Sequence, residues 1–100
     1  MGVLALERLL EGPQSWHGLP MALAQQWPAA PAGEIIFALI AAAQAIEGHF
    51  LEGGPAHEAA VQGYRLAAVL GLDLYALQVV GISAPRGQDL LDWWETEAGH

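Results

Sequence analysis

The sequence predicts an all-α fold, with five or six short helices around a central antiparallel helical hairpin over residues 34–70, assembled as a homodimer. Proline and glycine divide the chain into segments of helical length, and apolar residues recur within those segments every three or four positions. The chain is 54% hydrophobic and only 14% charged, more apolar than a small monomer can easily bury. One hundred residues suffice for one core, so we expect a single domain over 1–100.

The first third of the chain is expected to hold two short helices. Residues 3–11 place apolar and charged side chains on opposite faces, and Gly12, followed by proline, ends that helix. A loop is expected over 14–19. A second helix should run over 20–27, because proline suits the first turn of a helix and another proline follows at its end. Residues 28–33 are expected to form an extended linker.

The central hairpin has the strongest helical pattern. Residues 34–51 are apolar nearly all round, and Gln44 is the only polar residue between positions 35 and 46, which is typical of a helix buried on several sides. A tight turn is expected at 53–55. The second helix should cover 56–70 and end at Gly71.

The C-terminal part is expected to add two more helices. Asp73 is a candidate N-cap for a short helix over 74–80, with Leu72 and Leu77 packed as a hydrophobic staple. A strand over 78–82 is the alternative, although the sequence offers no partner strand. The last helix should begin within 83–87 and turn these side chains inward: Leu90, Leu91 and Trp94.

The charge balance disfavours two classes of partner. The net charge is −8, with three arginines and no lysine, so the chain cannot supply the basic surface that binds nucleic acid or an anionic membrane. Arginine in place of lysine, with abundant alanine and glycine, is typical of GC-rich bacterial genomes. There is no cysteine, which excludes disulfides and thiolate chemistry. We expect a cytoplasmic protein without a cofactor.

A group of histidines and carboxylates around the hairpin turn is a candidate metal site. Imidazole and carboxylate groups together suit zinc, iron or manganese. The spacing does not match a helical metal motif, so a polar hairpin end exposed to water is the competing interpretation. The candidate ligands are Glu47, His49, Glu52, His57 and Glu58.

A pocket between helices is the second candidate site. A loop histidine beside an aromatic residue can line a pocket, although such a pair more often packs over the edge of a core. Neither serine lies in a nucleophile elbow, so no catalytic residue is predicted. The candidate lining consists of Trp16, His17, Trp27, His49 and Tyr64.

The predicted function is a non-enzymatic interaction or regulatory module that self-associates and binds a protein partner. Tryptophan is enriched at interface hot spots, and the chain has four. The predicted interface comprises Ile36, Ile40, Ala43 and Trp93. The alternatives are a small-ligand-binding protein with an apolar pocket between helices and a small metal-dependent enzyme.

Overall fold

The computed structural model describes residues 1–49 and 54–98 and contains six helices within them. The predicted all-α class is confirmed for this part of the chain. The molecule is elongated, with extents of 43 × 24 × 21 Å. The helices are α1 (Gly2–Glu11), α2 (Pro13–Trp16), α3 (Leu19–Gln26), α4 (Ala32–His49), α5 (Gly54–Val79) and α6 (Gly87–Ala98).

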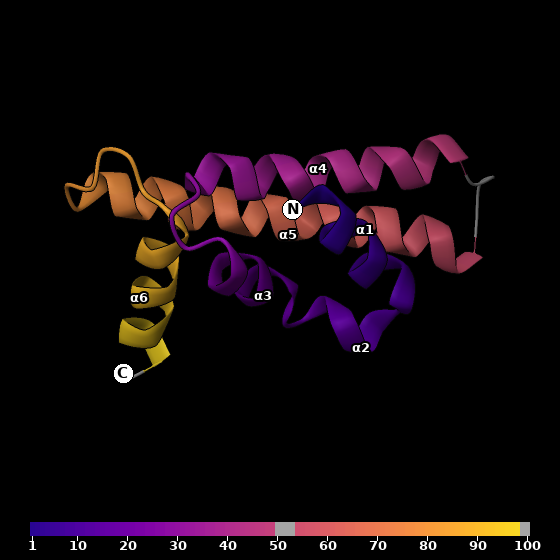
Figure 1. Ribbon diagram of the computed structural model, residues 1–100, viewed down its shortest axis with the longest axis horizontal. Coiled ribbons are helices and arrows are strands. Elements are labelled where there is room, and N and C mark those ends of the chain that lie inside the picture. The colour runs from indigo at the N-terminus through magenta and orange to yellow at the C-terminus, as the bar shows by residue number, and fades with distance from the viewer. Residues whose placement is uncertain (50–53, 99–100) are drawn as a thin grey trace.

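Helices α4 and α5 lie side by side along the long axis and run in opposite directions (Figure 1). Helix α1 contacts both of them, and α3 contacts α6. The core forms where these helices meet, because each contributes leucine or isoleucine side chains from one face. The largest fully buried side chains are Leu9, Leu19, Leu23, Ile35, Leu39, Ile46, Leu70 and Leu90.

Helices α4 and α5 pack closely against each other at Gly63. A Cβ atom at this position would lie 3.0 Å from the Cβ atom of Ala43 and 3.4 Å from the carbonyl oxygen of Leu39. The sequence predicted that Ala43 lies at a contact with a second chain. The structure shows that the approaching helix is α5 of the same chain.

Helix α5 continues through the position where the sequence predicted its end. The expected break at Gly71 and new helix after Asp73 are both wrong. A glycine inside a helix costs only about 1 kcal/mol, and Leu77, which is 2% exposed, extends the buried face of α5 past that point. The Asp73 carboxylate accepts a hydrogen bond from Trp94 Nε1 at 3.0 Å instead of capping a helix. The helix ends two residues before Gly81, whose φ is 109°.

Two other boundaries differ from the prediction. One turn of helix, α2, occupies part of the loop expected over 14–19, and Trp16 Nε1 ties it to α1 by donating to the Leu9 carbonyl oxygen at 2.9 Å. Helix α4 begins at Ala32, inside the linker expected over 28–33. No strand forms among the residues that the structure describes, and none of their helices is long and apolar enough to cross a membrane.

Helix α6 is fixed by backbone hydrogen bonds to the segment between α3 and α4. Its first residue, Gly87, packs directly on this segment, and a Cβ atom there would lie 2.6 Å from the Trp27 carbonyl oxygen. Glycine is therefore required for the close approach. Three N–H groups donate across the contact: Gly87 to Ala30 (2.9 Å), Gln88 to Pro28 (2.9 Å) and Ala32 to Pro85 (2.8 Å).

Candidate functional site

The predicted metal ligands lie at one end of the α4–α5 pair. Glu47 and His49 are in the last turn of α4, His57 and Glu58 are in the first turns of α5, and Glu52 lies outside the described residues. Within residues 1–49 and 54–98, no group of three or more histidine or carboxylate side chains could hold a metal ion. The metal site, which includes Glu52, stays a prediction.

Glu47 has a defined contact with α5. Hydrogen bonding of the Tyr64 phenol to the Glu47 carboxylate is the main cause that raises the pKa of Tyr64 above its ordinary value of 10.0. Partial desolvation and the negative charge of Glu47 act in the same direction, because both disfavour a phenolate. This pair connects α4 with α5 near the polar end of the molecule.

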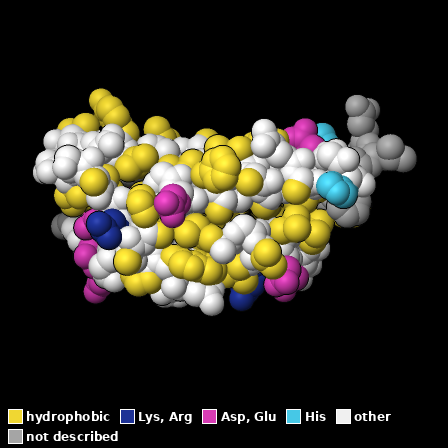
Figure 2. All heavy atoms as spheres, turned by 45° about the horizontal axis from the view of Figure 1, so that its top comes forward, with side chains coloured by type: hydrophobic (Ala, Val, Ile, Leu, Met, Phe, Trp, Pro, Cys, Tyr) yellow, Lys and Arg dark blue, Asp and Glu magenta, His cyan; other side chains and the backbone are white. Residues whose placement is uncertain are grey.

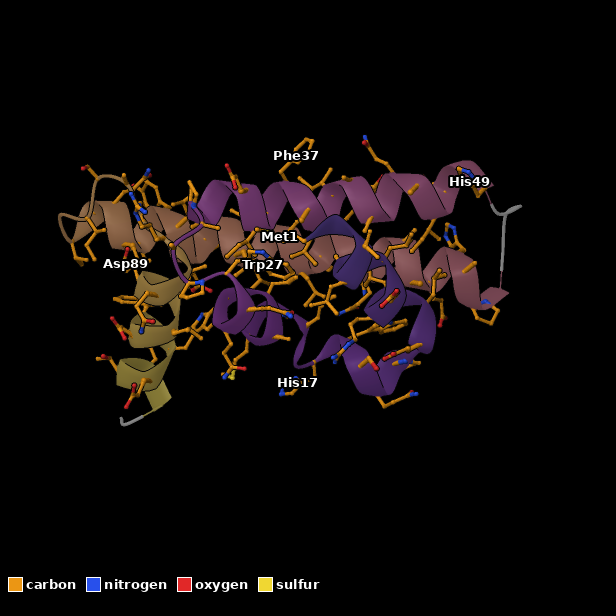
Figure 3. The ribbon with its side chains drawn as sticks, in the orientation of Figure 1. Met1, His17, Trp27, Phe37, His49 and Asp89 are labelled. Carbon is orange, nitrogen blue, oxygen red and sulfur yellow. The ribbon has the colours of Figure 1, made fainter. Side chains whose placement is uncertain are left out.

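The predicted pocket residues are dispersed over the molecule. His17 lies at the lower edge of the view, His49 at the C-terminal end of α4, and Trp27 lies away from both (Figure 3). Among the described grooves, Trp16 lines one between α1, α2 and α5, with a volume of about 450 Å³. His17 lines a different groove, so these two neighbours in sequence face separate surfaces.

The groove that contains His17 lies between α3, α5 and α6 and measures about 290 Å³. Its lining is mostly apolar, and the two polar atoms of the Asp73–Trp94 hydrogen bond belong to residues in its wall. Met21 and Leu66 contribute to the same wall. An apolar groove with few polar groups is the kind of site that accepts a small hydrophobic molecule.

The four predicted interface residues expose little surface. Ala43 has none, because it packs against α5 within the chain. Ile36 and Ile40 are half-buried against the core, and so is Trp93. The Trp93 Nε1 atom is buried without a hydrogen-bond partner. The interface between chains through these four residues stays a prediction.

Large apolar side chains are exposed instead along the second half of α5. We call the following residues the α5 stripe: Ala68, Val69, Leu72, Tyr75 and Val79 of α5, with Val80, which directly follows the helix. Five of them are more than half exposed, from Val69 at 56% to Leu72 at 71%. The sequence prediction missed this surface because it divided α5 at Gly71. In an uninterrupted helix, positions 68, 72, 75 and 79 share one face.

A second exposed apolar surface lies where α1 meets α4. Phe37 is 69% exposed and Val3 is 70% exposed. Phe37 projects outward from α4 (Figure 3). Together with Met1 and Glu34, it lines a shallow groove at the N-terminal end of α1. Figure 2 shows one face of the molecule, on which hydrophobic side chains cover much of the length and charged side chains are widely spaced.

The described residues thus present two exposed apolar surfaces and several open grooves. Of the two surfaces, the α5 stripe has the larger number of exposed large apolar side chains. No protein-family model, no curated protein and no solved structure matches this chain.

Proposed function

We propose that this chain is a non-enzymatic, cytoplasmic helical interaction module that forms a homodimer and binds a protein partner. In this proposal the α4–α5 pair is the central antiparallel hairpin of each subunit. The observation that supports it is the exposure of large apolar side chains in groups on α5 and around Phe37. Grouped apolar side chains on a surface mark interaction sites more often than single ones do.

The surface area supports self-association. The chain exposes 6008 Å², whereas a compact monomer of 10.6 kDa is expected to expose about 5,500 Å². The chain gains free energy when a second chain covers its exposed apolar side chains.

The two apolar surfaces suit different roles. A homodimer uses the same surface on both subunits, so any charge on that surface meets a like charge on the partner. In a chain with a net charge of −8, an uncharged surface is therefore favoured for the dimer contact. The α5 stripe contains no charged residue. The surface around Phe37 includes Glu34, so it suits a protein partner that offers an apolar side chain together with a cationic one.

Native mass spectrometry over a concentration series tests the proposed function. We expect a species of twice the 10.6 kDa chain mass, without added mass from a metal or small molecule. A monomer at every concentration would refute self-association. A species heavier by a metal ion would direct attention to Glu47, His49 and the other predicted ligands.

The groove between α3, α5 and α6 favours a second candidate function, the binding of a small hydrophobic molecule. Trp94 lies in its wall, so its fluorescence should change when an apolar dye binds there. Saturable binding of one dye molecule per chain, lost in a Met21→Glu variant, would support this alternative. Binding that is unaffected by Met21→Glu would exclude the groove.

A further inference from the structure

We propose that a second copy of this chain docks on the α5 stripe, with the two α5 helices antiparallel across a two-fold axis. This inference rests on the proposed self-association and specifies which surface carries it. The argument depends on the shape of the stripe, its charge and its area.

Most of the α5 stripe lies on the free side of its helix, and Val69 lies at its edge, where it also lines the groove between α3, α5 and α6. Leu70 and Leu77 are 1% and 2% exposed and face the core. Leu72 and Tyr75 are 71% and 67% exposed, because they lie on the opposite face of the same turns. The distance from position 68 to position 79 along the axis is about 17 Å, enough for three turns of helix to meet a straight partner.

The charge distribution favours this surface over the one around Phe37. Asp73 is the only charged residue from position 66 to position 85, and its carboxylate accepts a hydrogen bond from Trp94 in the groove that Val69, at the edge of the stripe, also lines. Asp73 lies on a different face of α5 from Leu72, Tyr75 and Val79. Phe37 lies three residues after the exposed Glu34, and Val3 lies four residues before the exposed Glu7. A two-fold contact through Phe37 would therefore bring carboxylates of both copies together, whereas a contact through α5 would not.

The exposed area of the stripe fits a dimer interface. Five large side chains, each 56–71% exposed, together leave roughly 600 Å² uncovered, at the upper end of what a monomer exposes in one patch. Complete burial of these side chains in both copies would remove roughly 1,200 Å² in total, which is the lower limit of specific protein–protein interfaces. A second copy is a sufficient occupant, because its own stripe has the same length and the same apolar character.

The spacing along the helix also gives a register. In an antiparallel pair, the residues that face each other have position numbers with a constant sum. A sum of 147 places Leu72 opposite the partner subunit's Tyr75 and Ala68 opposite the partner subunit's Val79. Each large side chain near the axis then meets a large one, and the alanine near one end of the stripe accommodates a valine. The centre of the interface is the Leu72–Tyr75 contact.

Matched charge substitutions test this docking mode. Leu72→Glu and Phe37→Glu alter two side chains of nearly equal exposure, 71% and 69%, on different surfaces. We expect Leu72→Glu to weaken dimerisation by roughly 100-fold or more, because it places two carboxylates at the centre of the interface. Phe37→Glu should leave the dimer unchanged. Sedimentation velocity over a concentration series measures both, and far-UV circular dichroism verifies that each variant is folded.

The outcomes separate the two proposals. A monomeric wild-type chain refutes self-association as a whole. If the wild-type chain is a dimer, two results would refute docking on α5 while self-association stands. One is a Leu72→Glu variant that is still a dimer, and the other is a Phe37→Glu variant that dissociates as strongly as Leu72→Glu.

Cross-linking decides the question if Leu72→Glu does not fold. The chain has no cysteine, so Leu72→Cys and Phe37→Cys each introduce a unique thiol. We expect a short bis-maleimide to link Leu72→Cys into a covalent dimer and to leave Phe37→Cys monomeric. The reverse result would overturn the inference.

Discussion

The substitution Gly87→Ala tests the contact that fixes α6 to the segment between α3 and α4. The added Cβ atom would lie 2.6 Å from the Trp27 carbonyl oxygen, and ordinary contact begins at about 3.4 Å. The chain must therefore move by about 0.8 Å. The hydrogen bonds from Gly87 to Ala30 and from Gln88 to Pro28 are both 2.9 Å long. Such a shift would lengthen both beyond the usual donor–acceptor distance of a hydrogen bond.

The expected cost follows from these two bonds. Each contributes about 0.5–1.5 kcal/mol, so we expect Gly87→Ala to lower the free energy of unfolding by about 1–3 kcal/mol, as overpacked sites commonly do. In a domain of this size, the melting temperature would fall by roughly 4–8 °C for each kcal/mol.

Gly33→Ala is the matched control for Gly87→Ala. It makes the same change in the first turn of another helix, where no atom lies within 4 Å of the added Cβ atom. Thermal unfolding followed by circular dichroism at one fixed protein concentration compares the two variants with the wild type. We expect no loss of stability from Gly33→Ala. If Gly87→Ala melted at or above the wild-type temperature, the tight contact at α6 would be refuted.

The two adjacent tryptophans of α6 should respond differently to phenylalanine. Trp94→Phe leaves the partly buried Asp73 without its indole donor and should cost about 1–3 kcal/mol, whereas Trp93→Phe removes a buried donor that has no partner and should cost less. Urea denaturation measures both, and equal losses would contradict the assigned roles. Glu47 raises the pKa of Tyr64 above 10.0. Their contact therefore stabilises the fold below pH 10, and this stabilisation is lost as the pH rises through the folded-state pKa of Tyr64. An NMR titration of the Tyr64 ring should show its pKa move back toward 10.0 in Glu47→Gln.

The sequence predicted helices well where proline or a charged face marked their ends. The Gly-Pro pair after α1 and the nearly unbroken apolar run of α4 were correctly recognised, with boundaries within two residues at the described ends. Gly71 was misjudged because a glycine is compatible with both a helix end and a helix interior. Only tertiary packing distinguishes it from Gly81, which has a positive φ and follows the end of α5.

The sequence prediction did not single out the α5 stripe for the same reason. Dividing α5 at Gly71 turned Leu72 into a buried staple residue, although it is 71% exposed. Ala43 was expected at a contact between chains, but its partner is Gly63 of the same chain, and no local pattern reveals which helix meets a small residue. The close approach of Gly87 to Trp27 joins distant parts of the sequence, so it could not be inferred from spacing.

The attachment of α6 has a consequence for the order of folding. Its hydrogen bonds join residues far apart in the sequence, and Arg86 donates to the carbonyl oxygen of Ala29 across 57 positions. Closing so long a loop costs chain entropy. The contact between α4 and α5 costs less, because these helices are neighbours along the chain. We expect α6 to dock after the transition state. Destabilising substitutions at Gly87 should then accelerate unfolding and leave the refolding rate nearly unchanged, which makes α6 the part of the molecule that sets its kinetic lifetime.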